Sequence, residues 1–354
     1  MAIVINGSGT VTGLAVGGLP DGTVDAGTLA TDSVVTGKIA DGTIANADIA
    51  DLAASKLTGA LPVISGASLT SVNAVNGGRK NIIINGDFRI NQRGLTTSAV
   101  AVTNGAYNTD RMKNYLVGVS GTVALGSAEA VNGTYETPLK YTAGSTASGR
   151  IGGYQAVEDW HLGETLTASA WVKSDNANAR IVAYDGSTTT SSNTHTGGGA
   201  WELLTVTFTQ RTNAGQLYIW SAIISATVGS VSIASGDYIY TSKFQCERGS
   251  VATDFERLND GEQLALCQRY YFKSELTYFT GFSDGNTSTR CAVDGQHPVT
   301  MRTDPTVTYN QQSLSGSPLT GTAKKNGFYY VFNSQYANRG GITDISSYVA
   351  DAEL

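Results

Sequence analysis

The chain has 354 residues, of which 42 are glycine and only 15% are charged, and its formal net charge is −6. This length is sufficient for two or three domains. The charged fraction lies below the roughly 25% that is usual for soluble domains, which favours an extended or densely packed β protein over a cytosolic enzyme. No basic stripe is present to neutralise phosphates, so nucleic acid is not expected as a partner.

The N-terminus has no basic segment followed by an apolar run, so no secretory signal is expected. No segment approaches the roughly 18 apolar residues of a membrane helix, and membrane insertion is not expected either. The cysteines, Cys246, Cys267 and Cys291, cannot all pair and lack metal-ligand spacing. We predict reduced thiols that pack as small hydrophobic side chains.

The N-terminal fifth of the chain predicts a fibrous element. Residues 1–20 carry short apolar clusters broken by glycines, and residues 21–50 repeat as DGTVDAGTLA, TDSVVTGKIA and DGTIANADIA. A fixed period is typical of fibrous and solenoid proteins. A single chain cannot cover the apolar stripe that the repeat creates. We therefore predict an attachment element at 1–20 and a trimeric shaft with its linker at 21–79, the alternative being a disordered linker. The predicted trimer axis is lined by Val24, Leu29, Val34, Ile39, Ile44 and Ile49.

From residue 80 to residue 258 the chain is a succession of short β-like runs separated by polar turns. In the run at 166–173 the apolar residues are Leu166, Ala168, Ala170 and Val172. Eight or more such runs without intervening helices predict a β-sandwich of the jelly-roll type. Its core is expected to include Leu204, Val206, Phe208, Phe244 and Cys246.

The last part of the chain, 259–354, opens on a predicted helix. Asn259 and Glu262 have the spacing of a capping box. Leu264, Cys267 and Tyr271 then fall on one helical face. In the strand predicted before this helix, alternation places Tyr238, Tyr240, Phe244 and Cys246 on one side. Further β-like runs after the helix predict a small distal β domain, so the fold class is mainly β.

Several segments resemble a module of bacteriophage tail fibres and related virion proteins. They are FQCERGSVAT at 244–253, FER at 255–257, LALCQRYY at 264–271, NIIINGDFRINQRG at 81–94, TASAWVKS at 167–174, HPVTMRTDPTV at 297–307 and ADAEL at 350–354. The decapeptides are similar to tail-fibre shaft repeats. The resemblance implies a virion protein made in the host cytoplasm. Its N-terminus would bind a baseplate or tail protein, and its distal domains would bind a glycan on the host surface.

The opening strand is also similar to carbohydrate-binding jelly rolls, in which Asp87 would be a ligand of a structural calcium ion. The closing strand has Gln245-Cys246-Glu247 where that pattern has paired acids. No cofactor is therefore predicted, with structural calcium as the alternative.

Catalytic patterns give little support for an enzyme. Glycoside hydrolysis requires two carboxylates, and the nearest candidates, Glu158 and Glu164 with His161 between them, are interpreted as a polar turn. No nucleophile elbow, phosphate-binding loop or metal-ligand pattern is present. The alternatives to a non-catalytic adhesin are a polysaccharide-degrading tailspike and a purely structural adaptor or collar fibre.

Aromatic side chains are the candidates for receptor binding, because sugar rings stack on flat apolar faces while a tyrosine hydroxyl stays hydrated. The predicted contact residues are Tyr329, Tyr330, Tyr336, Tyr278, Trp160 and Trp201, with Tyr184 as a further candidate. Trp220 lies in an apolar run and is predicted to be a core residue.

Overall fold

The computed structural model describes residues 4–5, 11–12, 79–158, 161–274, 277–281, 290–311, 320–333 and 341–353. The chain divides into two units, Met1–Ser71 and Val72–Leu354. In the first unit the described residues form β1 (Val4–Ile5) and β2 (Val11–Thr12), which pair antiparallel. The six predicted axis residues lie outside the described residues, so the trimeric shaft and the four-part division of the chain stay predictions.

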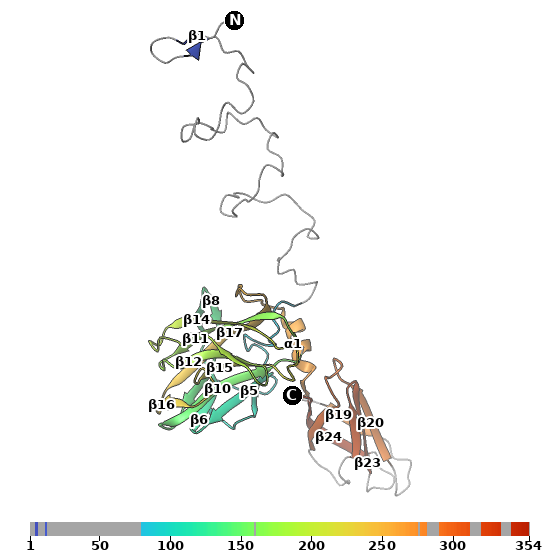
Figure 1. Cartoon of the computed structure of the whole chain (residues 1–354). Coiled ribbons are helices and arrows are strands. Elements are labelled where there is room, and N and C mark those ends of the chain that lie inside the picture. The colour runs from blue at the N-terminus through green and yellow to red at the C-terminus, as the bar shows by residue number, and fades with distance from the viewer. Residues whose placement is uncertain are drawn as a thin grey trace. The chain divides into compact units, whose positions relative to one another are not determined.

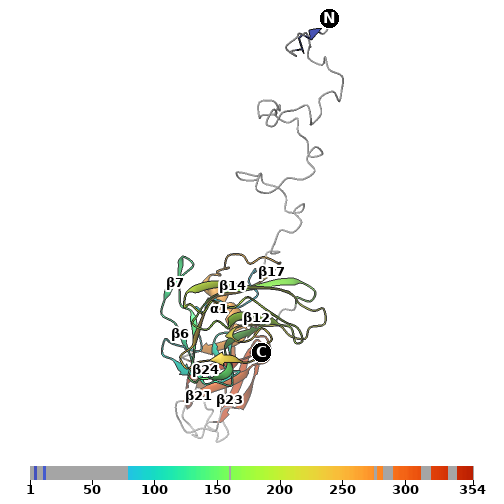
Figure 2. The same cartoon turned by 60° about the vertical axis from the view of Figure 1, so that its left-hand side comes forward.

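Two antiparallel sheets form a β-sandwich in the second unit (Figure 1). The first, here called the β14 sheet, has the order β14 (Trp201–Thr209), β11 (Thr165–Ser174), β17 (Tyr238–Arg248), β9 (Leu139–Ala143), β6 (Gly121–Leu125) and β3 (Val100–Ala101). The second, the β12 sheet, has the order β13 (Thr189–Ser191), β12 (Ala179–Tyr184), β15 (Tyr218–Ile223), β10 (Ala147–Ala156), β5 (Met112–Val117) and β4 (Tyr107–Thr109), with β16 (Val231–Ile233) beside β10. Figure 2 shows the same sandwich from another side, with the hairpin of β7 (Glu129–Val131) and β8 (Thr134–Glu136). The prediction of a mainly β fold with a β-sandwich is confirmed.

The predicted alternation on β11 and β14 sets the sandwich core. Leu166, Ala168, Ala170 and Val172 are fully buried, and β14 alternates between buried and exposed residues from Leu204 onward. Successive side chains of a strand point to opposite faces, so a period of two in the sequence places one set in the core. The predicted core residues Leu204, Val206, Phe208, Phe244 and Cys246 all belong to this cluster.

The structure corrects the predicted faces of β17. Ile239 is buried in the core, whereas Tyr238 and Tyr240 are half-buried on the opposite face. The pairing between β11 and β17 shifts register, and Lys243 has a φ of 51°, which together define a β-bulge. The extra residue inverts the alternation, so Phe244 points into the core although the two tyrosines do not.

The predicted helix is α1 (Asp260–Gln268). Asn259 is its N-cap, and its side chain accepts a 2.9 Å hydrogen bond from the backbone N–H of Glu262, as predicted. The predicted apolar face is wrong in part: Cys267 is buried, but Leu264 is not, and Tyr271 already begins β18. Within the described ranges the chain has no helix with the length and apolar character of a membrane span.

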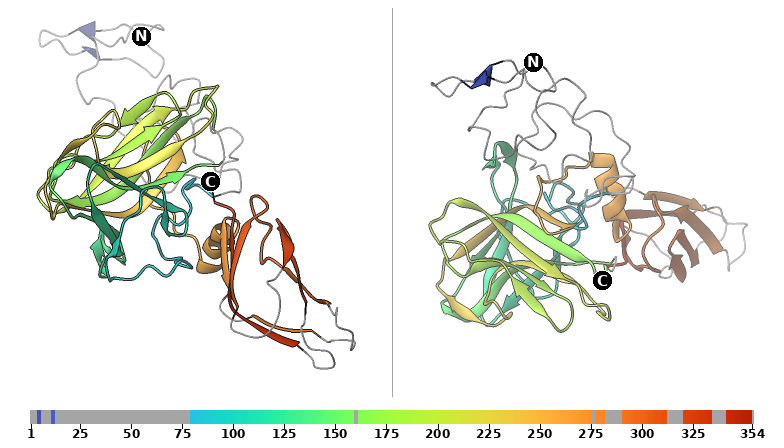
Figure 3. Two further views of the ribbon diagram at one scale, coloured as in Figure 1. Left: turned by 90° about the horizontal axis from the view of Figure 1, so that it is seen from below. Right: turned by 45° about the horizontal axis from the view of Figure 1, so that its top comes forward.

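Two further sheets follow α1 and match the predicted distal β region (Figure 3). One contains β18 (Tyr271–Ser274), β24 (Gly341–Asp351), β19 (Thr277–Gly281) and β21 (Thr306–Gln311), and the other contains β20 (Arg290–Gln296), β23 (Gly327–Asn333) and β22 (Thr320–Lys324). The Tyr348 and Phe328 rings pack at a tilt of 36° with centroids 4.5 Å apart, and the Tyr348 hydroxyl lies 3.0 Å from Nε2 of the buried His297. This segment therefore has a small core of its own.

The residues after β24 contact the sandwich directly. Glu353 forms an ion pair with Arg111, and both side chains are almost fully buried. Arg93 lies 3.3 Å from the same carboxylate. The backbone N–H of Ala352 donates a 2.7 Å hydrogen bond to the carbonyl of Tyr270, whose ring lies 3.6 Å from the Arg111 guanidinium carbon. A buried ion pair thus ties the C-terminal strand to the β12 sheet.

Asp110, next to this ion pair, should make stability fall with rising pH. Its buried carboxylate accepts a 2.7 Å hydrogen bond from the Gln92 backbone, and burial raises its pKa to about 6 from 3.8. Between these pH values the folded state binds more protons than the unfolded state, so the free energy of unfolding decreases as pH rises. Relative to Asp110→Asn, the wild type should lose about 3 kcal/mol between pH 3.5 and pH 7 in urea unfolding. Parallel pH profiles for the two proteins would contradict this prediction.

Candidate functional site

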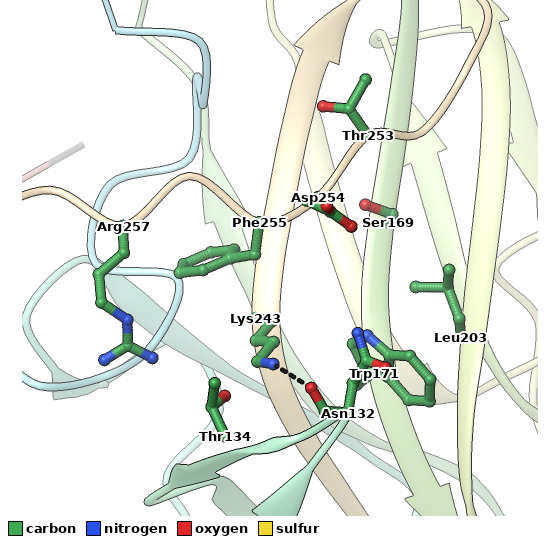
Figure 4. A pocket seen from close by; sticks show the side chains of 10 residues that line it. All are labelled: Asn132, Thr134, Ser169, Trp171, Leu203, Lys243, Thr253, Asp254, Phe255 and Arg257. Carbon is green, nitrogen blue, oxygen red and sulfur yellow. Dashed lines mark hydrogen bonds between the residues drawn. The ribbon is translucent and has the colours of Figure 1, made fainter. Parts of the chain in front are cut away.

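A cavity of about 300 Å³ opens on the outer face of the β14 sheet (Figure 4). Its floor comes from β11 and β14, one side from the β7–β8 hairpin, and the other side from the segment that follows β17. It is lined by Asn132, Thr134, Ser169, Trp171, Leu203, Lys243, Thr253, Asp254, Phe255 and Arg257. This volume suits one or two small rings, at the lower end of known ligand pockets.

The floor is an apolar surface with a hydroxyl beside it. Trp171 is half-buried, its register partner on β14 is Leu203, and Leu203 is 49% exposed. Ser169 lies two residues from Trp171 and therefore on the same face. All three point outward because they alternate with core residues. An indole next to an exposed aliphatic side chain and a hydroxyl is a surface on which a sugar ring can stack.

The bulge on β17 brings Lys243 to this outer face. Its Nζ donates a 2.8 Å hydrogen bond to the carbonyl of Val131 in the hairpin and lies 3.8 Å from the Glu136 carboxylate. Burial lowers the pKa of Lys243, and Glu136 opposes that effect. Without the extra residue the side chain would point to the other face of the sheet. Lys243 therefore fixes the hairpin against the cavity.

The opposite wall is held by buried polar side chains of β17. Glu247 is fully buried and accepts hydrogen bonds from the backbone N–H and the hydroxyl of Thr253, at 2.8 and 2.7 Å. Gln245, also buried, accepts a 2.8 Å bond from the backbone of Glu256. Lys80 donates a 2.5 Å bond to the carbonyl of Asp254. These bonds position the wall before any ligand arrives, which reduces the entropy cost of binding.

Four polar groups of the lining remain available to a ligand. The Ser169 hydroxyl, the Trp171 indole N–H, the Asn132 amide and the Asp254 carboxylate make no hydrogen bond to the described part of the chain. Figure 4 shows Asp254 and Ser169 on the same side of the cavity. Together they supply donors and acceptors around an apolar floor, the combination that recognises sugar hydroxyls.

Asp87, the predicted calcium ligand, is occupied by arginines. Its buried carboxylate lies 2.5 Å from Nε of Arg89 and 3.7 Å from Nη1 of Arg257. Arg257 also donates a 2.6 Å hydrogen bond to Glu136. Among the described residues no group of three or more His, Cys, Asp or Glu side chains is arranged to hold a metal ion. Two guanidinium groups already neutralise Asp87, so these residues do not fit a calcium ion.

The sequence-predicted receptor residues are only partly placed by the structure. Trp201 is half-buried on the outer face of the β14 sheet, two residues from Leu203, and its ring lies 6.3 Å from the Tyr240 ring in perpendicular orientation. It extends the aromatic surface beyond the cavity. Trp220 is 5% exposed, as expected of a buried residue, although its cluster lies outside the sandwich core. The structure does not describe the side chains of the other predicted contact residues, which are Tyr278, Tyr329, Tyr330, Tyr336 and Trp160. Their role in receptor binding stays a prediction.

The two carboxylates considered for catalysis have separate partners. Glu164 lies 2.8 Å from Nε of Arg248 and 3.1 Å from Nδ1 of His161. Glu158 accepts a 2.5 Å hydrogen bond from the Tyr270 hydroxyl and pairs with an arginine after α1. Neither carboxylate lines the cavity on the β14 sheet. The structure therefore engages each of them in a local ion pair.

Sequence reasoning missed most of the cavity. The alternation at 166–173 places Trp171 opposite the apolar set but assigns it to no site, and Phe255 and Arg257 belong only to a resembling segment. The local signal was Lys243, a charged residue in the middle of β17 that is nevertheless buried. Such a residue indicates a bulge or a cavity.

No family model and no curated protein matches the chain. The chain is similar in part to several solved structures. The tailspike protein 4 enzymatically active domain of bacteriophage CBA120 is 14% identical, with a TM-score of 0.32, over 42% of this chain and 21% of that one. The module TmCBM61, in complex with β-1,4-galactotriose, is 16% identical, with a TM-score of 0.29, over 48% of this chain and 100% of the module. The family 11 carbohydrate-binding module of a Clostridium thermocellum cellulase is 14% identical, with a TM-score of 0.26, over 45% and 99%. At these scores the likeness assigns no ligand or reaction to this chain, which spans about a fifth of the tailspike chain.

Proposed function

We propose that this chain is a glycan-binding protein and that the cavity on the β14 sheet holds one or two sugar rings. The observation that carries the proposal is the apolar floor of half-buried Trp171 and exposed Leu203, with hydrogen-bonding groups around it that have no partner in the described part of the chain. A sugar ring presents an apolar face and equatorial hydroxyls, and this lining complements both. The buried Glu247 and Gln245 hold the wall in place, so little ordering is required on binding.

The lining supports binding of a glycan better than it supports cleavage of one. Asp254 is the single carboxylate among the lining residues, whereas most glycoside hydrolases use two on either side of the scissile bond. A polysaccharide that binds to the chain should keep its length after prolonged incubation. Size-exclusion chromatography measures this, and shortening of the polymer would favour the tailspike alternative.

Trp171→Ala should weaken glycan binding by about tenfold or more, because a stacked aromatic anchor at the centre of a site carries much of its affinity. A glycan array probed with the full chain selects the ligand, and calorimetry then measures Kd for wild type and variant. Tyr135→Ala is the matched control, since Tyr135 lies on the β7–β8 hairpin, is 80% exposed and does not line the cavity. Equal Kd values for Trp171→Ala and wild type would exclude this site.

We further propose that the chain acts as a homotrimeric receptor-binding protein of a phage tail fibre. On this proposal residues 1–20 attach to a baseplate or tail protein and 21–79 form the shaft. The ten-residue recurrence of apolar side chains and the resemblance to virion proteins support it. Three copies would convert a weak glycan contact into avid adhesion. Light scattering of the full chain should give the mass of a trimer, and a monomer would contradict the proposal.

A further inference from the structure

The outer face of the β12 sheet carries a second aromatic surface, on the other side of the sandwich from the cavity. Four neighbouring strands, β5, β10, β15 and β12, contribute Tyr115, Tyr154, Tyr184, Tyr218 and Trp220. Tyr154 and Trp220 are register partners, with ring centroids 5.6 Å apart, and Tyr184 is the partner of Tyr218 at 6.5 Å. Trp220 is buried among tyrosines that are themselves only partly buried.

The charges on this face all have one sign. The seven strands of the β12 sheet, each within the described part of the chain, contain no Asp or Glu. They contain three basic residues, Lys113, Arg150 and Arg180, each next in sequence to a core residue and therefore facing outward. A wholly basic sheet face in a chain of net charge −6 indicates an anionic partner.

Hydrogen-bond donors on this face lack acceptors. Arg180 makes no hydrogen bond or ion pair to the described residues, its Nε is buried, and burial lowers its pKa with no acidic neighbour to oppose the effect. Arg150 donates from Nη1 to the Tyr115 hydroxyl at 2.6 Å and to the Val228 carbonyl at 2.7 Å, yet its buried Nε has no acceptor among the described residues. The indole N–H of Trp220 is also unpaired. Unpaired buried donors cost free energy unless a ligand supplies acceptors.

The row of the sheet that contains Arg180 continues through two small, buried residues. Across the strands its register partner is Ala222, followed by Gly152 and then Tyr115. Arg180 and Tyr115 are thus separated by two positions without bulky side chains. A polymer whose carboxylate binds Arg180 would extend along this row towards Tyr115.

We propose that this face binds an acidic polysaccharide, with uronate carboxylates paired to Arg180 and Arg150 and sugar rings packed on the tyrosines. Planar guanidinium groups match the two oxygens of a carboxylate. Tyrosine supplies an apolar face and a hydroxyl for the ring. The ligand class differs from that of the β14 cavity, whose lining has both signs of charge, and the proposal does not depend on that cavity.

The test measures binding of polygalacturonate, alginate and hyaluronate to the full chain by calorimetry, with the carboxyl-reduced form of each polymer as its neutral counterpart. At least one acidic polymer should bind, more weakly as salt rises, and its reduced form should bind about tenfold less tightly or worse. Arg180→Gln should weaken binding of the acidic polymer by about tenfold or more. Arg248→Gln is the matched control, because its side chain is 61% exposed on β17 in the β14 sheet.

Three results would overturn the proposal. They are binding of none of the acidic polymers, equal affinity of wild type and Arg180→Gln, and equal affinity for the reduced polymer. A change in oligomeric mass on Arg180→Gln would instead assign the face to a contact between copies of the chain. Loss of acidic-polymer binding in Trp171→Ala would move the ligand to the β14 cavity. If Arg180→Gln still binds the ligand selected on the glycan array, then the function proposed for the β14 cavity stands whatever the acidic polymers do. The two proposals can therefore fail independently.

Discussion

Glu353→Ala should lower the free energy of unfolding by about 3–5 kcal/mol, because it leaves the buried Arg111 guanidinium without its counter-ion. Both side chains of this pair are less than 5% exposed, and the remaining Arg111 contacts are the carbonyl of Ala156, at 2.8 Å, and the ring of Tyr270. Denaturant unfolding followed by circular dichroism at pH 7 measures the loss.

Asp351→Ala is the matched control for this prediction. Asp351 lies 3.4 Å from Arg93 and accepts a 3.0 Å hydrogen bond from the backbone N–H of Glu353, but its side chain is 37% exposed, so its removal should cost about 1 kcal/mol. The double variant Arg111→Met/Glu353→Met should recover much of the stability, since a buried ion pair is often no better than apolar residues of similar volume. A loss below 1 kcal/mol in Glu353→Ala would mean that the C-terminal strand is not held through this pair.

Phe244→Ala should also cost about 3–5 kcal/mol, the usual range for truncating a fully buried phenylalanine. The side chain is 0% exposed in the sandwich core. Its backbone donates a 2.8 Å hydrogen bond to the carbonyl of Gly86 and accepts a 3.1 Å bond from the side chain of Asn81. A cavity here would therefore weaken the packing of the opening segment against β17.

Leu203→Ala provides the comparison within the same sheet. Leu203 is 49% exposed on β14, so its truncation should change stability by about 0.5 kcal/mol or less. If Phe244→Ala and Leu203→Ala unfold at similar denaturant concentrations, then the bulge at Lys243 does not orient Phe244 as described.

The two aromatic surfaces would serve different ligands on the same chain. The β14 cavity is a small, mixed-charge site with rigid walls, and the β12 face is broad and basic. Trp171→Ala and Arg180→Gln separate these contributions, because each side chain belongs to one surface alone.

Local pattern determined much of this fold from the sequence alone. The alternation of Leu166, Ala168, Ala170 and Val172 placed β11 in the core, since the side-chain period of a strand is a property of the backbone. The cap at Asn259 was equally local, because a cap and its acceptor lie within one helical turn. Neither feature depends on which strand lies next to which.

Only the tertiary structure decided the sites. The bulge at Lys243 exists because the pairing of β17 with β11 shifts register, and the sequence of one strand does not fix the register of its pairing. Phe255 reaches the cavity because a segment after β17 passes over the β14 sheet. Tyr115 and Trp220 meet across the β12 sheet from positions about a hundred residues apart, at a centroid distance of 5.9 Å. Long-range pairing sets such contacts, whereas the periodicity of a single strand reports only which of its faces is apolar.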